Sequence, residues 1–348
     1  MYKVALIGCG NIARTKHALA LAKQPDVELV GFFDLSTQAA EALAKEFGSK
    51  EAKIYQCVDD VFEDSNIDIV HICTPNNTHA EYSIRAMRGG KHVMCEKPMA
   101  TTVSDAEKMV RVSEETGKQL SVSYQHRYRT QYQFLKKEVD SGKLGEIYYA
   151  KAHAVRRRGV PTWGNFLDKQ VQGGGSLIDI GTHALDLVLH LMGNYDVESV
   201  SGTSYQKFKN KKDTGNQWGN WDPEVFDVDD SSFGFIRMKN GSTVLLESSW
   251  CLNTLDSGVA EVTLCGTNAG ADTRQGLRLN GDRNNELYTE VMEFKDEHAN
   301  EIEARQWIES LKNNTPPYVT ARQGLVVTRV LDAIYRSAET GKQIYLDD

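Results

Sequence analysis

Four side chains that could carry acid–base chemistry occur in two separate stretches of this sequence. Asp179 and His183 are four residues apart, and Asp186 follows His183 by three. On an α-helix this spacing places all three side chains on or near one face. The fourth group is Lys97, which closely follows the apolar run 92–95. An imidazole titrates near neutral pH and an ammonium stabilises negative charge, so these groups suit proton transfer at the oxygen of an alcohol.

Each of these residues also has a purely structural interpretation. The helix around His183 is otherwise apolar, and Asp186 could simply satisfy that imidazole inside the core. Lys97 could be a surface lysine in a polar loop. A functional role is favoured because three titratable groups share one face after the triple glycine 173–175. It is also favoured because charges next to a buried strand are costly unless they are paired or used.

A glycine-rich turn near the N-terminus predicts a dinucleotide site. The sequence GCGNIA at 8–13 follows a buried-strand pattern at 3–7 and begins a helical pattern at 13–23. Gly8 permits the tight turn, Gly10 lets the backbone approach a pyrophosphate, and the helix N-terminus attracts the phosphates. The expected cofactor contacts of this turn are Gly8, Gly10, Asn11 and Ile12. The alternative is a unit of the same architecture that binds no nucleotide.

Further cofactor contacts are expected where other strand patterns end. The pattern 27–33 ends at Asp34, which lies 21 residues beyond Ala13. A carboxylate at this place accepts hydrogen bonds from the adenosine ribose and repels a 2′-phosphate, which favours NAD over NADP. Two later loops add the expected contacts Thr74, Pro75, Asn76, His79, Glu96 and Lys97. The alternative for the first of these loops is an ordinary turn with a helix cap.

Strand and helix patterns alternate through the first 120 residues. The strand patterns are 3–7, 27–33, 52–55, 67–74, 92–95 and 119–124. Such alternation predicts an α/β fold with a doubly wound, mostly parallel sheet. Ligands of these sheets bind at the carboxyl ends of the strands, so the residues after each strand matter most.

The second half of the sequence changes character. Helical patterns at 130–141 and 173–192 flank a strand pattern at 147–155. The later strand patterns, which alternate polar and apolar residues, are 197–205, 230–238, 242–250 and 259–265. They predict an open, largely antiparallel sheet with one face covered by helices, including closing helices at 297–313 and 321–340. The polar segment 207–224 is interpreted as a long loop or flap.

The composition bounds the class of protein. A length of 348 residues favours two domains, and 25% charged with 40% hydrophobic residues is ordinary for a globular protein. A net charge of −8 disfavours nucleic acid or an anionic membrane as a partner. The sequence has no apolar run of about 18 residues, no room for a signal peptide before the first strand and no C-x-x-C motif. We therefore expect a cytoplasmic protein with free thiols and no metal.

Four motifs, in order, resemble the Gfo/Idh/MocA family of NAD(P)-dependent oxidoreductases over nearly the whole chain. They are GCGNIA at 8–13, TPNNTH at 74–79, EKP at 96–98 and GGGSLIDIGTHALD at 173–186. The resemblance implies an NAD-binding Rossmann domain, 1–123, and an α/β domain, 124–348, that binds substrate. It also implies that the open sheet of the second domain forms homo-oligomers, either dimers or tetramers.

The resemblance further implies roles for individual residues. Lys97 would contact both the substrate oxygen and the cofactor, Asp179 would hold substrate hydroxyls, and His183 would be the acid–base catalyst. The segment YQHRY stands where the family often reads N-x-R-F/Y. It places Gln125 at the cofactor and Arg127 at the substrate, although glutamine and histidine replace the usual asparagine.

The segment RRRGVPTW at 156–163 stands where subfamilies place substrate- and nicotinamide-contacting groups. Alternation along a strand would put Arg156 and Arg158 on one face. Both are candidate substrate-binding residues, and one of the arginines is expected to reach the active site. Trp163 is expected at the nicotinamide. The alternative is a solvated basic edge strand.

The combined hypothesis is a hydride transfer between a secondary alcohol and nicotinamide. Its substrate would be a cyclic polyol or sugar, because an apolar substrate would leave the expected Asp, His, Lys and Arg groups unpaired. A metal is not expected, because no second His or Cys stands at zinc-binding spacing. Two other functions remain open: an NAD-retaining enzyme that breaks glycosides by transient oxidation, and a regulatory protein that has lost catalysis.

Overall fold

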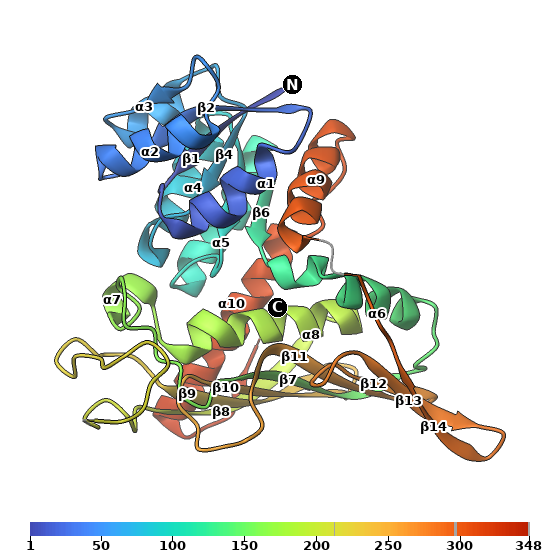
Figure 1. Ribbon diagram of the computed structural model, residues 1–348. Helices are drawn as coiled ribbons and strands as arrows, with labels where there is room; N and C mark the ends of the chain where they lie inside the picture. The colour runs from blue at the N-terminus through green and yellow to red at the C-terminus, as the bar shows by residue number, and fades with distance from the viewer. Residues whose placement is uncertain (212, 296–297, 347–348) are drawn as a thin grey trace. The chain divides into compact units, whose positions relative to one another are not determined.

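The computed structural model of the chain describes residues 1–211, 213–295 and 298–346 (Figure 1). It divides into two compact units. The first comprises Met1–Tyr128 and His298–Leu325, and the second comprises Arg129–Glu297 and Val326–Asp348. No helix within the described residues is long and apolar enough to cross a membrane.

The first unit is built on a six-stranded parallel sheet, which confirms the doubly wound fold expected from the sequence. The strand order is β3-β2-β1-β4-β5-β6, and every neighbouring pair is parallel. The strands are β1 (Tyr2–Ile7), β2 (Val27–Phe33), β3 (Lys53–Ile54), β4 (Ile69–Ile72), β5 (His92–Glu96) and β6 (Leu120–Ser123). Their carboxyl ends carry the glycine turn, Asp34 and Lys97, as the sequence predicts.

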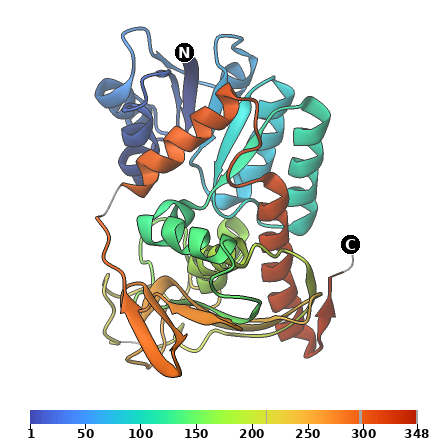
Figure 2. The same cartoon turned by 90° about the vertical axis from the view of Figure 1, so that its right-hand side faces the viewer.

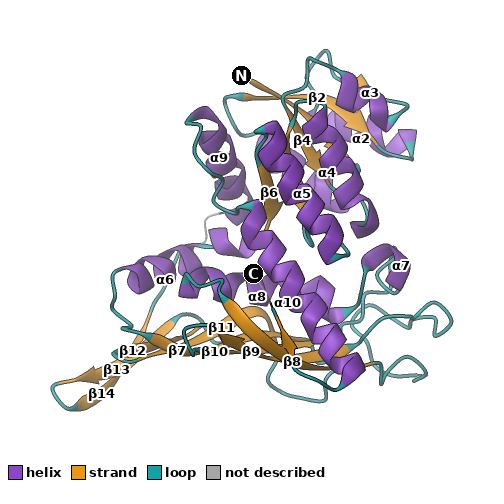
Figure 3. Ribbon diagram, turned by 180° about the vertical axis from the view of Figure 1, so that it is seen from behind, coloured by secondary structure: helices purple, strands orange, loops and turns teal. Residues whose placement is uncertain are grey.

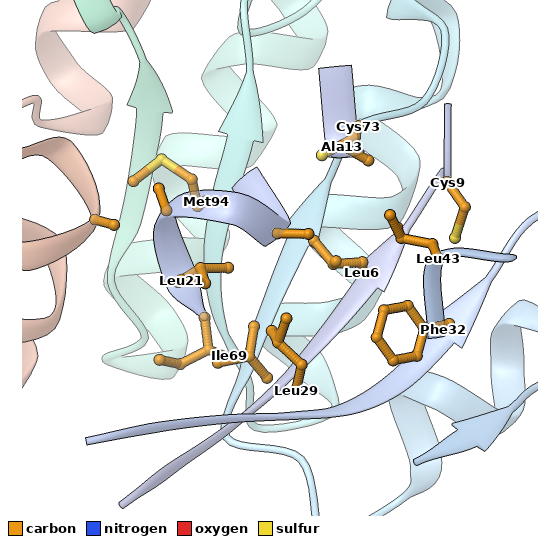
Figure 4. Close-up of a cluster of buried hydrophobic side chains, with 14 of the residues drawn as sticks. Leu6, Cys9, Ala13, Leu21, Leu29, Phe32, Leu43, Ile69, Cys73 and Met94 are labelled. Atoms are coloured by element: carbon orange, nitrogen blue, oxygen red, sulfur yellow. The ribbon is translucent and has the colours of Figure 1, made fainter. Parts of the chain in front are cut away.

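Helices surround this sheet (Figures 1 and 2). They are α1 (Leu19–Leu21), α2 (Thr37–Phe47), α3 (Val58–Glu63), α4 (His79–Arg88), α5 (Val103–Thr116) and α9 (Ala299–Lys312), with short 3-10 turns η2 (Asn76–Thr78) and η3 (Gln125–Tyr128). The side chains of Ser36 and Thr102 accept backbone N–H bonds and so begin α2 and α5. Figure 4 shows the resulting core, in which Leu6, Ile69 and Met94 of the sheet lie near Leu21.

The expected helix 13–23 is interrupted in a way the sequence does not reveal. A π-helical turn, η1 (Ala13–Ala18), precedes the single α-helical turn α1. Such a turn changes the direction of the following side chains relative to a regular helix. Lys16 and His17 are both buried as a result, although their polarity suggests an exposed face.

The first unit also includes residues 298–325, from near the C-terminus. The domain division expected at 123/124 does not place these residues in the first domain. Helix α9 packs against α1 and η3. Ser121 Oγ donates to the carbonyl of Val319 (2.9 Å), and Ser123 Oγ donates to Glu303 Oε1 (2.8 Å). These long-range contacts join residues 298–325 to the Rossmann unit, and no local sequence pattern announces them.

The second unit contains a nine-stranded sheet, ordered β14-β13-β12-β11-β7-β10-β9-β8-β15. Only β7 and β10 pair in parallel, so the expected largely antiparallel sheet is confirmed. The strands are β7 (Ile147–Val155), β8 (Val197–Tyr205), β9 (Ser231–Met238), β10 (Thr243–Ser249), β11 (Gly258–Gly266), β12 (Ala269–Asp272), β13 (Arg278–Arg283), β14 (Glu286–Val291) and β15 (Ile344–Tyr345). Strands β12 to β15 are not predicted from the sequence, because their polar and glycine residues give little alternation of apolar and polar positions.

Helices cover one face of this sheet (Figure 3). They are α6 (Thr130–Asp140), α8 (Thr182–Met192) and α10 (Ala321–Thr340), with a π-helical turn, η4 (Leu177–Gly181), leading into α8. The short helix α7 (Lys169–Gln172) lies beside loops of the same unit. The small residues Ala150, Ala152 and Ala154 of β7 are fully buried, and α8 packs against this strand. Within the described part of the chain, no helix covers the opposite face, which exposes half of the Phe235 side chain (50%).

Candidate active site

The glycine turn has the geometry that a bound pyrophosphate requires. Gly8 has φ +85°, and an added Cβ would lie only 2.7 Å from the carbonyl carbon of Cys73 on the neighbouring strand. A Cβ on Gly10 would meet nothing within 4 Å, so the backbone there faces open space. Asn11 and Ile12 are exposed beside it. The predicted residues therefore form an accessible turn at the end of β1, which fits the pyrophosphate of NAD.

Asp34 is held against the same turn. The backbone N–H of Cys9 donates to Asp34 Oδ2 (2.7 Å), and the N–H of Ser36 donates to Oδ1 (2.8 Å). Each carboxylate oxygen keeps further lone pairs for ribose hydroxyls. Position and charge both fit the adenosine ribose of NAD, as the sequence predicts.

Replacing Asp34 is expected to reduce the preference for NAD. In Asp34→Ala the ratio of Kd for NADP to Kd for NAD should fall about tenfold to a hundredfold. The variant loses two charge-assisted hydrogen bonds to the ribose hydroxyls of NAD, and it also loses the charge that repels the 2′-phosphate of NADP. Asp34→Asn keeps the acceptor for the Cys9 N–H and should lower the ratio less. Fluorescence titration with both dinucleotides measures the effect, and an unchanged ratio would show that Asp34 does not contact the ribose.

The loop after β4 is fixed by a buried histidine. His79 Nδ1 lies 2.7 Å from the carbonyl of Pro98, and Nε2 lies 2.9 Å from the carbonyl of Thr74. Burial lowers the pKa of His79, although the two carbonyls oppose the shift. The ring therefore connects the loop 74–79 to the loop that carries Lys97. Pro75 and Asn76 lie on the more accessible side of this loop.

Glu96 is the centre of a buried polar network at the end of β5. Its Oε1 accepts bonds from Lys16 Nζ and His17 Nε2, both at 2.7 Å, while Oε2 accepts the backbone N–H of Lys97 (3.1 Å). Burial opposes ionisation of Glu96, but Lys16 and His17 outweigh it and hold the pKa of Glu96 well below its usual range. An ionised carboxylate thus fixes the backbone from which the Lys97 side chain projects.

The network extends in two directions from Lys16. Its ammonium also donates to Ser123 Oγ (2.5 Å) and to Gln125 Oε1 (3.2 Å), and it lies 3.6 Å from Glu303 of α9. Burial lowers the pKa of Lys16, but Glu303 and Glu96 reverse this and raise it overall. Gln125, expected at the cofactor, thus has an ordered side chain in contact with Lys16.

Two histidines continue the network into the core. His17 Nδ1 lies 2.9 Å from His71 Nδ1. Burial and the neighbouring His17 and Lys16 depress the pKa of His71 well below 6.5, so this imidazole stays neutral. The sequence analysis missed these histidines and Lys16. Their only signal is charge at positions of the helical pattern that follow the glycine turn.

The triple glycine positions the helix that carries the second group of site residues. Asp229 accepts the N–H of Gly175 (2.7 Å) and of Leu177 (3.1 Å), and Tyr335 Oη donates to it (2.5 Å). A Cβ on Gly175 would collide with the Asp229 carbonyl, and one on Gly174 would collide with the Tyr335 hydroxyl. The glycines are therefore needed for close approach, and only Gly173 has a positive φ (+81°).

The three titratable residues of this helix differ in accessibility. Asp179 on η4 is half-buried, whereas His183 and Asp186 on α8 are 6% and 1% exposed. Asp179 Oδ2 accepts the indole N–H of Trp250 (3.0 Å) and lies 3.7 Å from Arg156 Nη1. The most accessible carboxylate of the helix therefore stands beside an arginine, in a setting suited to binding hydroxyl groups.

The arginine segment follows β7 instead of continuing it, so the expected strand alternation does not apply there. Arg156 and Arg158 are nevertheless half-buried and Arg157 is exposed. Arg156 reaches Asp179, while Arg158 Nη2 donates to Asn253 Oδ1 (2.5 Å). The structure thus identifies Arg156 as the arginine beside the candidate acid.

Arg127, for which the resemblance implies a substrate contact, is held by other residues of the first unit. Its side chain is fully buried, and Nη1 donates to the Tyr318 carbonyl (3.2 Å) and to Gln323 Oε1 (2.9 Å). These bonds connect two segments of the first unit. The substrate contact of Arg127 that the resemblance implies stays a prediction.

Comparisons with known proteins identify the family. A family model described as "Oxidoreductase family, NAD-binding Rossmann fold" matches residues 2–124, and the companion "Oxidoreductase family, C-terminal alpha/beta domain" matches 136–346. The chain is 37% identical over 345 residues to the D-glucoside 3-dehydrogenase of Escherichia coli K12, covering 99% of this chain and 97% of the relative. It is 24% identical to the myo-inositol 2-dehydrogenase of Thermotoga maritima, with 99% of each covered.

Solved structures share the fold over the whole chain. A levoglucosan dehydrogenase in complex with NADH and L-sorbose superposes with a TM-score of 0.86 at 20% identity, covering 100% of this chain and 99% of the other. An oxidoreductase domain protein from Kribbella flavida gives 0.87 at 21% identity, with full coverage of both chains. From the family models and the glycine turn, the chain is an NAD-binding oxidoreductase that belongs to the Gfo/Idh/MocA family.

Proposed function

We propose that this oxidoreductase transfers a hydride between nicotinamide and a secondary alcohol of a sugar or cyclic polyol. The names of relatives support this substrate class, since they include a D-glucoside 3-dehydrogenase, a glucose-6-phosphate 3-dehydrogenase and a myo-inositol 2-dehydrogenase. The structural observation that carries the proposal is the Asp179 carboxylate. It is half-buried, oriented by Trp250 and adjacent to Arg156, an arrangement that suits vicinal hydroxyls.

The proposed chemistry divides between three side chains. NAD held by the glycine turn and Asp34 would supply the acceptor for the hydride of the substrate carbon. His183 takes the proton from the hydroxyl on that carbon, and Lys97 stabilises the negative charge that develops on the oxygen. Asp179 holds a neighbouring hydroxyl and orients the ring. Because Lys97 and His183 belong to different units, their action on one substrate carbon is itself part of the proposal.

The proposed cofactor contacts lie at the carboxyl ends of the first sheet. The glycine turn binds the pyrophosphate, and Asp34 binds the adenosine ribose. The remaining proposed contacts, all from loops of the first unit, are Thr74, Pro75, Asn76, His79, Glu96, Lys97 and Gln125. Glu96 would act mainly through the backbone of Lys97, given the bond between them.

A spectrophotometric screen tests the function. The purified chain is incubated with NAD or NADP and a set of aldoses, methyl glucosides and inositols, and absorbance from reduced nicotinamide is followed. Oxidation of at least one of these compounds with NAD supports the proposal. Sugar release from a glycoside without net NADH would favour the NAD-retaining alternative. Reaction with none of them in either direction would contradict the substrate class.

We also propose that the open sheet face forms a homo-oligomer. Phe233, Phe235 and Leu245 lie on this face, with Leu245 directly opposite Phe235 in the register of β9 and β10. Large exposed apolar patches mark interaction surfaces. Phe235→Glu is expected to shift the protein to a smaller species in light scattering coupled to size exclusion. Leu255→Glu, in an exposed loop, is the control, and an unchanged mass in Phe235→Glu would contradict the interface.

A further inference from the structure

Two loops of the second unit bring several aromatic side chains together outside the proposed acid–base group. Trp163 packs edge-on against Trp218, with ring centroids 4.9 Å apart and an interplanar angle of 90°. Phe166 packs against the same indole at 5.7 Å. Despite these contacts, half of the Trp163 surface is exposed (50%). An indole held firmly by its neighbours, yet exposed on one side, is a preformed apolar surface.

The two loops are tied together by hydrogen bonds, which hold the indoles in place. Asn216 Oδ1 accepts the N–H of Val160 (2.9 Å), and its Nδ2 donates to the carbonyl of the same residue (3.0 Å). Thr162 Oγ1 donates to the carbonyl of Trp218 (2.6 Å). Asn216 and Trp218, which belong to the part of the sequence interpreted as a loop or flap, are thus anchored to the arginine segment. Preorganisation of this kind reduces the entropy lost on binding.

The aromatic surface is continuous with the candidate substrate site. The guanidinium of Arg156 lies over the Trp218 ring at 5.1 Å and also lies 3.7 Å from Asp179 Oδ2. Among the described residues, the side-chain hydrogen bond of Arg156 is made by Nη1, which donates to the Gly159 carbonyl (3.1 Å). Its other N–H groups are therefore available to a ligand. A single run of contacts leads from Asp179 through Arg156 and Trp218 to the exposed Trp163.

This arrangement exceeds what a single sugar ring needs. Two side chains, Arg156 and Trp218, stand between Asp179 and the exposed indole of Trp163. A ring whose hydroxyls bind Asp179 would leave that indole to a second group. A pyranose has an apolar C–H face and a rim of hydroxyls, so it matches an exposed indole bordered by arginine donors.

We propose that Trp163 and Trp218 form a second sugar subsite, which holds the ring attached to the oxidised ring in a disaccharide. The inference rests on the proposed function, because it takes Asp179 as the group that binds the first ring. It specifies the substrate class further: glucosides with a sugar as the attached group should be preferred to free sugars and methyl glucosides. It also gives Trp163 a substrate role in place of the expected nicotinamide contact.

The test compares kcat/KM for disaccharides with kcat/KM for methyl glucosides. Cellobiose and maltose present both anomeric linkages, and methyl β- and α-glucoside are their single-ring counterparts. In Trp163→Ala the disaccharide-to-methyl-glucoside ratio should fall about tenfold, the effect of losing one stacking contact. Trp163→Phe should retain most of the ratio. Tyr148→Ala removes an aromatic of similar exposure (56%) elsewhere in the unit and should leave the ratio unchanged.

Several results would contradict the second sugar subsite without contradicting the proposed dehydrogenase function. Equal losses for one-ring and two-ring substrates in Trp163→Ala would rule out a second subsite. A weaker Kd for NAD in this variant would instead return Trp163 to the nicotinamide. Wild-type enzyme that oxidises methyl glucosides but not disaccharides would refute the subsite while sustaining the function. If no sugar is oxidised, the function fails. Quenching of tryptophan fluorescence by cellobiose then still tests the subsite, and its absence refutes it.

Discussion

Lys97→Ala is expected to lower kcat about 100-fold or more, with a smaller change in KM. The proposed role of the ammonium is to stabilise charge that develops on the substrate oxygen, and this charge is largest in the transition state. An interaction made mainly there affects kcat more than substrate binding. The backbone bond from Lys97 to Glu96 fixes the residue before substrate arrives, so catalysis does not have to spend free energy on ordering it.

Steady-state kinetics on the best substrate from the screen measure this effect. Lys118→Ala is the matched control, because Lys118 precedes β6 and therefore lies at the amino ends of the same parallel strands. Its kcat should stay within about twofold of wild type, as is usual for surface substitutions away from a site. If Lys97→Ala retains more than a tenth of the wild-type turnover, Lys97 does not take part in the chemistry.

His183→Ala should lower kcat to a similar extent, and it should also change the pH profile. A neutral imidazole accepts the proton during oxidation, so wild-type kcat/KM should fall at acidic pH, where protonation of His183 removes the base. This decrease of kcat/KM at low pH should be absent in His183→Ala. Lys97→Ala should keep it, which separates the two roles.

The sequence predicts best those features that depend on local steric requirements. The glycine turn has this character, because the positive φ of Gly8 and its close approach to Cys73 leave no other residue possible. The triple glycine also meets a local steric requirement, because Asp229 and Tyr335 pack directly against it. The sequence does not show that these two residues are its neighbours. These partners lie more than fifty residues away and come together only through the sheet.

The sequence predicts least well what depends on an interrupted helix or on distant packing. The π-helical turn at 13–18 buries Lys16 and His17, whereas a regular pattern suggests solvent exposure. The aromatic contacts of Trp163 and Trp218 depend on hydrogen bonds between loops some fifty residues apart. The burial of Arg127 is hidden from the sequence for a related reason, since a motif gives the residue type but not its surroundings.

The buried network around Lys16 should also control the acid stability of the first unit. The folded pKa of Glu96 is depressed, so its contribution is present above its unfolded pKa of about 4.3 and is lost as pH falls further. The folded pKa of His71 is also depressed, so below about pH 6.5 the unfolded state binds a proton that the folded state does not. Stability should therefore fall first below about pH 6.5, where His71 contributes, and again below about pH 4.3, where Glu96 contributes.

Lys16→Met is expected to destabilise the first unit by about 3–5 kcal/mol, because it leaves the buried carboxylates of Glu96 and Glu303 without their ammonium partner. The exposed pair Lys23–Glu301 offers a matched control, since it also connects the N-terminal helical segment to α9. Lys23→Met should cost less than about 1 kcal/mol, the usual value of a solvated pair.

Hydrogen exchange of peptides from β4 and β5 during urea titration reports the first unit alone. If the two variants lost equal stability, the network would be no stronger than a surface ion pair. Glu96 would then lack the rigidity that the proposed positioning of Lys97 requires.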